Sequence, residues 1–204
     1  MKLYLVTGHC SQQDKSVIDI VMQAVAGGVD MVQLREKDMS DEEMTELARR
    51  LHERLKPTGV PLIINDRVNV AKAIDAEGVH VGQSDMSYTE VRKILGHDKI
   101  IGLSCENMQQ VIEANDLDVD YIGISPVFST PTKTDTAAPF GLEGLREACR
   151  LSRHEIVAIG GINISNIRDI RDAGADSAAV VSAIVDAADP MKAASELKSL
   201  TQHK

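Results

Sequence analysis

A glutamine and two cations alternate in the run QLREK at positions 33–37, directly after a short apolar stretch. Alternation along a β-strand would send Gln33, Arg35 and Lys37 to the same side. Two positive side chains beside an otherwise apolar strand are costly unless an anion lies near them. The spacing therefore predicts an anion-binding edge. The alternative is that Arg35 and Lys37 pair with Glu36 or with other surface carboxylates.

Two aspartates follow the next two apolar runs and could hold a hard cation. Asp66 comes after the run PLIIN, and Asp85 ends the segment GQSD at 82–85. Two carboxylates, with ligand phosphate oxygens and water, are a usual way to complete the octahedral shell of Mg²⁺. The sequence thus predicts a magnesium site at Asp66 and Asp85. For Asp85 the alternative is an acidic residue near the N-terminus of a helix that Ser87 begins.

Glycines and small residues end two later runs. The segment VAIGGI contains Gly160 and Gly161, and the segment VVSAI contains Val181 and Ser182. Glycines let backbone amides approach an oxyanion, and a helix that begins there adds the positive end of its dipole. Together the two segments predict a phosphate-binding pair of loops, although a tight turn alone would also explain the glycines.

Ser104 and Cys105 at the end of another run suggest a nucleophile. No histidine is placed in the sequence to activate either residue, and a lone cysteine is more often a small buried side chain. We therefore do not expect covalent catalysis. His9 and His80 lie on or beside predicted strands, where a packed or solvent-bonded histidine is more common than a general base.

Eight short β-branched runs recur along the chain and are typical of strands, several of them apolar throughout, as strands buried on both faces are. They are Leu3–Thr7, Met31–Arg35, Leu62–Asn65, Gly78–Val81, Ile100–Ser104, Tyr121–Val127, Ile156–Ile159 and Ser177–Ser182. Helical patterns lie between them. Ser40 opens one with a capping box, Asn163 and Ser165 could cap another, and Ser87–Leu95 and Gly141–Leu151 form two more. The repeated strand–helix order predicts an α/β protein with a (β/α)8 TIM barrel.

One barrel would take up the whole chain. A length of 204 residues is near the lower limit for this fold, and no linker or shift in composition marks a boundary. We therefore expect one domain over residues 1–204, with the active site at the C-terminal ends of the strands. The loop from Thr130 to Pro139 is long and polar, which favours a mobile lid as much as a surface excursion.

The composition argues against several other classes of protein. The net charge is −9 and aromatic residues make up 2% of the chain, which disfavours a nucleic-acid-binding surface. Three cysteines without a CxxC motif disfavour a disulfide scaffold or a zinc site and are typical of a reducing cytosol. No signal peptide or membrane-spanning stretch is evident. We expect a cytoplasmic protein that acts on small molecules and could form a homo-oligomer.

In this order, the motifs resemble thiamine phosphate synthase along nearly the whole chain. The matching segments are QLREK at 33–37, NDR at 65–67, GVHVGQSD at 78–85, GLS at 102–104, DYIGISPVFSTPTK at 120–133, FGLEGL at 140–145, VAIGGI at 157–162 and VVSAI at 180–184. The STPTK run together with QLREK is the specific part of the resemblance. The glycine motifs alone would fit other phosphate-binding barrels.

The resemblance implies a transferase that joins 4-amino-2-methyl-5-hydroxymethylpyrimidine diphosphate to 4-methyl-5-(2-hydroxyethyl)thiazole phosphate and releases diphosphate. It also implies a dissociative substitution, in which Mg²⁺ and cations stabilise the leaving group and the thiazole nitrogen captures a pyrimidine-methyl cation. Contacts to the pyrimidine diphosphate would come from Gln33, Leu34, Arg35, Glu36, Lys37, Asn65, Ser104 and Lys133. The thiazole phosphate would be held by Thr130, Pro131, Thr132, Gly161, Val181 and Ser182. Among all of these, the residues implied to act in catalysis are Arg35, Lys37, Ser104 and Lys133, and the implied Mg²⁺ ligands are Asp66 and Asp85.

Other interpretations remain open beside this resemblance. Glu106 stands where many relatives have a histidine, so we expect no catalytic role for it. The nearest rival is a thiazole tautomerase, a related barrel that tends to lose the diphosphate and metal residues and uses a histidine near the position of Pro126. A non-catalytic binding barrel is a second alternative, but it would leave the carboxylate pair and the cations without a purpose. A sugar-phosphate isomerase is a third and would need a general base.

Overall fold

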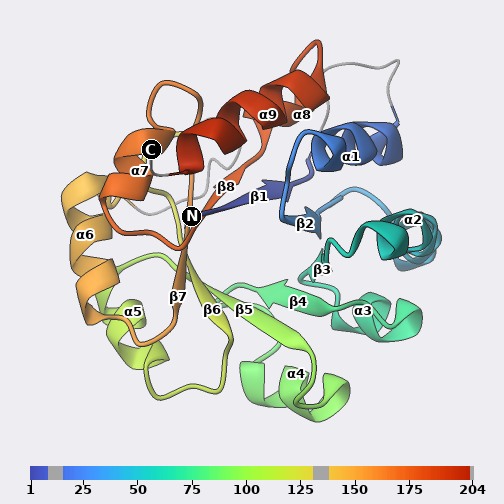
Figure 1. Ribbon diagram of the computed structural model, residues 1–204. Coiled ribbons are helices and arrows are strands. Elements are labelled where there is room, and N and C mark those ends of the chain that lie inside the picture. Colours follow the sequence, from blue (N-terminus) through green and yellow to red (C-terminus); the bar gives the residue numbers. More distant parts are fainter. Residues whose placement is uncertain (9–15, 131–137, 203–204) are drawn as a thin grey trace.

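A computed structural model of the protein describes residues 1–8, 16–130 and 138–202, and in it eight parallel strands form a closed barrel (Figure 1). The strands are β1 (Lys2–Val6), β2 (Met31–Leu34), β3 (Leu62–Asn65), β4 (Gly78–Val81), β5 (Ile100–Cys105), β6 (Tyr121–Ile124), β7 (Glu155–Ile159) and β8 (Ser177–Val180). Each strand pairs with the next along the chain, and β8 pairs with β1 to complete the ring. The predicted (β/α)8 barrel is confirmed.

Helices surround the barrel on its outer side (Figure 1). They are α1 (Val17–Ala26), α2 (Asp41–Leu55), the short 3-10 helix η1 (Lys56–Thr58), α3 (Val68–Ile74), α4 (Tyr88–Leu95), α5 (Met108–Ala114), α6 (Gly141–Leu151), α7 (Ile167–Asp172), α8 (Ser182–Val185) and α9 (Pro190–Thr201). Among the described residues, none of these helices has the length and apolar character needed to cross a membrane.

Three of the predicted helix starts are confirmed, among them Gly141 at the start of α6, and one is wrong. Ser40 forms the capping box of α2, and Ser87 caps α4. The cap expected from Asn163 and Ser165 does not form, because the side-chain oxygen of Asn163 accepts the Ser165 amide within a turn. Helix α7 begins only after Asn166. A polar residue near a helix start can satisfy its own turn instead of the helix.

The strands predicted over 121–127 and 177–182 are shorter than expected, since β6 ends at Ile124 and β8 at Val180. Of the residues that follow them, Ser125, Val181 and Ser182 line the mouth of the barrel. After β6, the amides of Ser125 and Val127 still donate to the carbonyls of Cys105 and Ile159, so single hydrogen bonds to the neighbouring strands persist beyond the regular strand.

Side chains along the strands alternate between two apolar cores. The outward side chains, among them Leu5, Val32 and Ile64, are fully buried beneath the helices. The inward side chains form a smaller cluster that fills the barrel, made of Tyr4, Val6, Ile63, Tyr121, Val157 and Ala179. The two tyrosines in this inner cluster bring hydroxyl groups into the core, where each needs a hydrogen-bond partner.

Four carboxylates stand at the N-terminal edge of the barrel, one directly before each even-numbered strand. Each accepts the amide N–H near the start of the preceding odd-numbered strand, at 2.6 to 2.8 Å. The donor–acceptor pairs are Leu3–Asp30, Leu62–Glu77, Ile101–Asp120 and Ile156–Asp176. These bonds give a partner to backbone groups at the strand starts, where the barrel begins.

Three of the four carboxylates also contact a basic residue. That residue lies on the helix that comes before the same odd-numbered strand around the closed barrel. The pairs are Lys198 of α9 with Asp30 at 2.6 Å, His52 of α2 with Glu77 at 3.0 Å, and Arg92 of α4 with Asp120 at 3.1 Å. At the fourth position α6 offers Cys149 instead. Burial and the charge of Asp176 raise the pKa of the Cys149 thiol to about 11.

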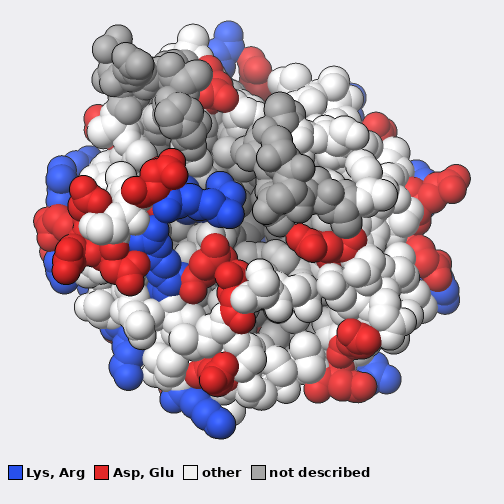
Figure 2. Space-filling model, turned by 180° about the vertical axis from the view of Figure 1, so that it is seen from behind, with Lys and Arg blue, Asp and Glu red and all other residues white. Residues whose placement is uncertain are grey.

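Figure 2 shows one face of the molecule as a mixture of acidic and basic side chains. Among the described residues visible there, Lys and Arg are interspersed with Asp and Glu and do not form a continuous basic surface. A protein that binds a phosphate backbone usually gathers its cations on one face.

Candidate active site

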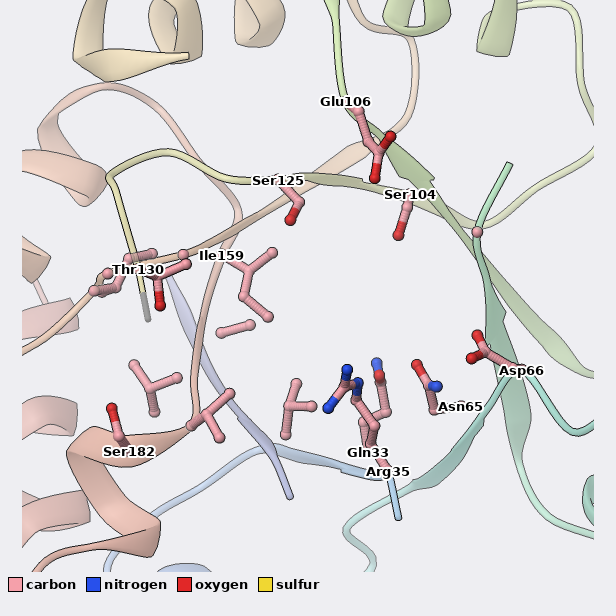
Figure 3. A pocket seen from close by; sticks show the side chains of 18 of the residues that line it. Gln33, Arg35, Asn65, Asp66, Ser104, Glu106, Ser125, Thr130, Ile159 and Ser182 are labelled. Carbon is pink, nitrogen blue, oxygen red and sulfur yellow. The ribbon is translucent and has the colours of Figure 1, made fainter. Parts of the chain in front are cut away.

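A cavity of about 660 Å³ opens at the C-terminal ends of the strands, where barrels of this kind place their active sites. Its polar lining includes Gln33, Arg35, Lys37, Asn65, Asp66, Gln83, Asp85, Ser104, Glu106, Thr130, Asn163 and Ser182. Figure 3 shows Gln33, Arg35 and Asn65 on one side of the opening, with Thr130 and Ser182 farther around the ring. Residues that are far apart in the sequence therefore surround a single space.

Gln33, Arg35 and Lys37 all line this cavity, as the predicted alternation requires. The two side chains between them lie elsewhere. Leu34 is fully buried in the outer core, and Glu36 lines a smaller pocket beside the main one. A contact between Leu34 and a ligand in the main cavity would therefore have to use its backbone.

The guanidinium of Arg35 points into the cavity (Figure 3). Its backbone is held by Thr7, whose hydroxyl oxygen accepts the Arg35 amide at 2.9 Å. Within the part of the chain that the structure describes, neither Arg35 nor Lys37 forms an ion pair with a carboxylate. The two cations remain available to an anion in the cavity.

Asp66 and Asp85 come together from the loops after β3 and β4. Asp66 has a left-handed backbone with a φ of 59°, and its amide donates to the carbonyl of His80 at 2.8 Å. Such a conformation costs a non-glycine residue roughly 1 kcal/mol or more. The carboxylate of Asp85 accepts the Gly82 amide at 2.7 Å. Burial, followed by a hydrogen bond with Asp85 and by its charge, raises the pKa of Asp66 to about 6, against a smaller opposing effect of Lys37.

The residues of this carboxylate pair suit a divalent cation. Burial first, and then the neighbouring Asp85, disfavour the ionised form of Asp66, and a hard cation such as Mg²⁺ would stabilise it. The described residues contain no group of three or more His, Cys, Asp or Glu that could hold a metal. Further ligands would therefore be water or substrate oxygens. The cap of α4 is Ser87, so Asp85 is not needed for that task.

Backbone groups line the opposite side of the cavity. Gly160 and Gly161 have φ values of 107° and 66°, and a Cβ on Gly161 would lie 2.8 Å from the Cβ of Phe128. Glycine is therefore required there by conformation and by space. Helix α8 begins at Ser182 without a side-chain cap, so the amides of its first turn have no partner from such a cap. These features fit a bound oxyanion.

A chain of hydrogen bonds runs below the cavity from Ser104 to Gln33. The Nε2 atom of His80 lies 2.8 Å from the Oγ atom of Ser104, and its Nδ1 atom lies 3.0 Å from the hydroxyl of Tyr121. The hydroxyls of Tyr121 and Tyr4 are 3.0 Å apart, and Tyr4 accepts a bond from Gln33 at 3.0 Å. The expectation that no histidine adjoins Ser104 is wrong, because strand pairing joins residues 24 positions apart.

The structure predicts different costs for two glycine substitutions beneath this chain of hydrogen bonds. A Cβ on Gly102 would lie 2.1 Å from the ring of Tyr121, whereas a Cβ on Gly123 would lie 3.2 Å from His80. We expect Gly102→Ala to lower the free energy of unfolding by about 3 kcal/mol or more, because the buried tyrosine must move. The matched variant Gly123→Ala should cost less than about 1.5 kcal/mol. Urea denaturation would measure both, and equal losses would contradict the packing described here.

His80 should make the stability of the protein depend on pH. Burial lowers the pKa of His80 from 6.5 to about 4, although the charge of Asp85 partly opposes this. The unfolded chain binds a proton near pH 6.5 and the folded chain only near pH 4, so the free energy of unfolding should fall as the pH falls across this interval. The loss attributable to His80 is on the order of 2–3 kcal/mol.

The measurement is urea denaturation of the wild type and of His80→Gln between pH 4 and pH 7. The variant should have a flatter profile, because it lacks the proton uptake on unfolding. Asp66, whose pKa is raised, acts in the opposite direction in both proteins, so only the difference between the two profiles is informative. Parallel profiles would show that His80 is protonated equally in the folded and unfolded states.

Sequence reasoning missed several residues that line the cavity, and some predicted residues lie outside the described chain. Gln83 donates to the carbonyl of Ser104 at 2.6 Å, and Asn163, expected to cap a helix, lies beside the glycine pair. Gln83 stands in the segment that supplied Asp85, so its polarity after an apolar strand was the available signal. The candidates outside the described residues are His9, Pro131, Thr132 and Lys133.

Known proteins resemble this chain over nearly its full length. Residues 3–184 match the family model described as thiamine monophosphate synthase. A thiamine-phosphate synthase of Vibrio campbellii is 52% identical over 96% of this chain and 95% of its own. One of Albidiferax ferrireducens is 48% identical over 98% and 91%. The solved structure of a thiamine phosphate pyrophosphorylase from Pyrococcus furiosus superposes with a TM-score of 0.89 at 34% identity, covering 98% of this chain and 95% of that one.

Proposed function

Because the chain belongs to the thiamine monophosphate synthase family, we propose that this transferase joins 4-amino-2-methyl-5-hydroxymethylpyrimidine diphosphate to 4-methyl-5-(2-hydroxyethyl)thiazole phosphate. The products are thiamine phosphate and diphosphate. The observation that supports this most is the single cavity, which has cations and paired carboxylates on one side and a glycine loop on the other. A diphosphate could bind on the side with the cations and carboxylates, and a separate phosphate ester could bind on the side with the glycine loop.

The diphosphate would bind between Arg35, Lys37 and the carboxylate pair. As the bond from the methylene carbon to the diphosphate oxygen breaks, negative charge grows on the leaving group, and Arg35 and Lys37 would stabilise it. Lys133 is proposed as a further cation. Asp66 and Asp85 would hold Mg²⁺, which when bound supplies additional neutralisation of the diphosphate. Gln33, Asn65 and Ser104 would hold and orient the pyrimidine diphosphate.

The thiazole phosphate would bind at the opposite wall. Backbone amides at Gly161 and at the start of α8, around Val181 and Ser182, offer donors to phosphate oxygens. Thr130 lines the same part of the cavity, and Pro131 and Thr132 are proposed to complete it. Two phosphate groups held at opposite walls would fix the thiazole nitrogen near the pyrimidine methylene carbon. Such positioning is itself a large contribution to rate.

A dissociative substitution needs no protein nucleophile, and the site offers a poor one. Cys105 is fully buried, and burial raises the pKa of its thiol to about 12, so it is not a thiolate near neutral pH. The side chains that reach the cavity are instead suited to binding anions. This favours capture of a pyrimidine-methyl cation by the thiazole nitrogen over a covalent enzyme intermediate.

A thiazole tautomerase is the alternative function. It would need only the thiazole phosphate wall and would have no use for Arg35, Lys37 and the Asp66–Asp85 pair. All four residues line the cavity, which favours the synthase.

The deciding experiment supplies both substrates to the purified protein, with Mg²⁺ or with EDTA, and detects product by oxidation to a fluorescent thiochrome compound. Thiamine phosphate formed only with Mg²⁺ is the expected result. A folded protein that binds thiazole phosphate but forms no product would overturn the synthase proposal in favour of the tautomerase or of a binding protein.

A further inference from the structure

Two residues that line the cavity, Gln33 and Ser104, are joined underneath it by two buried side chains and one half-buried side chain. The intervening groups are Tyr4, Tyr121 and His80, from β1, β6 and β4. Both tyrosines are almost fully buried, with 1% and 3% of their surface exposed. The proposed chemistry uses only the two end residues, so the three groups between them need a separate explanation.

Only one direction gives both tyrosine hydroxyl protons an acceptor within this chain. The amide nitrogen of Gln33 donates to the hydroxyl of Tyr4, and the proton of Tyr4 then finds its acceptor in the hydroxyl of Tyr121. The proton of Tyr121 then points to the Nδ1 atom of His80. A neutral imidazole that accepts at Nδ1 carries its proton on Nε2, which donates to the Oγ atom of Ser104.

This direction leaves the proton of Ser104 free for a ligand. Its oxygen is already an acceptor for His80, so the hydroxyl can act as a donor to an acceptor atom in the cavity. His80 therefore does not act as a base toward Ser104. The arrangement requires a neutral imidazole, which carries a single ring proton.

The barrel is built to accommodate this chain of hydrogen bonds. His80 and Tyr121 flank Gly102, with which both are in register on the neighbouring strands. A Cβ on Gly102 would lie 2.5 Å from the Nδ1 atom of His80 and 2.4 Å from the hydroxyl of Tyr121. The hydrogen bond between His80 and Tyr121 therefore passes through the space that a side chain at position 102 would fill.

We propose that His80 and Tyr121 are positioning residues that hold the hydroxyl of Ser104 as a hydrogen-bond donor to an acceptor atom of the substrate. Neither residue lines the cavity, so both act through Ser104. The inference rests on the proposed function only for its kinetic test. It gives His80 a role in setting the direction of a hydrogen bond and not in moving a proton.

The kinetic test compares two matched variants that each remove one hydroxyl from the same inner cluster. Tyr121→Phe removes the donor to His80 and should lower kcat/KM about tenfold. Tyr4→Phe leaves His80 as the acceptor for the Tyr121 hydroxyl and should lower kcat/KM about threefold or less. Ser104→Ala should also lose about tenfold, and the double variant Tyr121→Phe/Ser104→Ala should lose no more than Ser104→Ala alone. Additive losses, or equal losses for the two tyrosine variants, would overturn the proposal.

A second readout needs no substrate. Nitrogen-15 chemical shifts of the imidazole of His80 distinguish the two neutral tautomers at pH 7. The wild type and Tyr4→Phe should show the proton on Nε2, and Tyr121→Phe should show a mixture of both forms. A proton on Nδ1 in the wild type would overturn the proposal, even if the wild type makes no thiamine phosphate. The failure of this inference and that of the proposed function are thereby distinguished.

Discussion

Replacing Arg35 with alanine is expected to lower kcat/KM at least about a hundredfold without unfolding the protein. The guanidinium points into the cavity, and in the described chain no carboxylate neutralises it (Figure 3). In a partly desolvated site, a fixed positive charge stabilises developing negative charge far more than it would in water. Loss of the guanidinium should therefore slow departure of the diphosphate and have little effect on the stability of the folded protein. Steady-state kinetics with the thiochrome readout would measure the change.

Two further variants test whether charge or geometry is lost. Arg35→Lys keeps the charge but loses the planar fork of donors, so it should fall between the wild type and the alanine variant. Arg49→Ala on α2 removes an exposed arginine that pairs with Glu46 on the same helix, and it should keep activity within about twofold. If Arg35→Ala retained near-normal turnover, the cationic wall would have no role in the reaction.

Asp66→Asn is expected to abolish the dependence on Mg²⁺ and to lower kcat/KM at least about a hundredfold. The substitution keeps the shape of the side chain, and asparagine tolerates the left-handed backbone that Asp66 adopts. It replaces one of the two anionic ligands with a neutral amide and removes the repulsion between the carboxylates. The measurement has two parts: turnover against Mg²⁺ concentration, and the shift in melting temperature that Mg²⁺ causes.

Asp75→Asn is the matched control for that experiment. Asp75 also has a left-handed backbone, with a φ of 56°, but it lies at the end of α3 and pairs with Lys99 at an exposed position. We expect normal turnover and an unchanged response to Mg²⁺. A normal Mg²⁺ response in Asp66→Asn would mean that the metal binds elsewhere, whereas a loss in both variants would implicate the backbone conformation instead of the carboxylate.

Much of the fold follows from patterns that act over a few residues. Runs of β-branched residues and the capping box at Ser40 depend on local conformational preferences, and both predicted which elements form, although two strands end earlier than expected. The alternation of Gln33, Arg35 and Lys37 also holds, because successive side chains on a strand must point to opposite faces. These three residues lie within one short segment, so a local pattern is enough to predict which way their side chains point.

The relation between His80 and Ser104 could not be predicted in the same way. It depends on the pairing of β4 with β5 and on the absence of a side chain at Gly102, which is visible only when the neighbouring strands are in register. The repulsion between the like charges of Asp66 and Asp85 also arises only where two loops meet. Interactions between strands decide such features, and a single sequence does not state their geometry.

The ring of carboxylates at the N-terminal edge makes the barrel a set of four similar quarters. A quarter consists of one odd-numbered strand and the even-numbered strand after it, and its carboxylate links the two through a hydrogen bond to a backbone amide. Three of the carboxylates also contact a basic residue on a helix of the preceding quarter. The seam between α6 and β7 is different, since Cys149 faces Asp176 there. We expect this seam to open first, so that the amide of Ile156 exchanges with deuterium faster than those of Leu3 and Leu62.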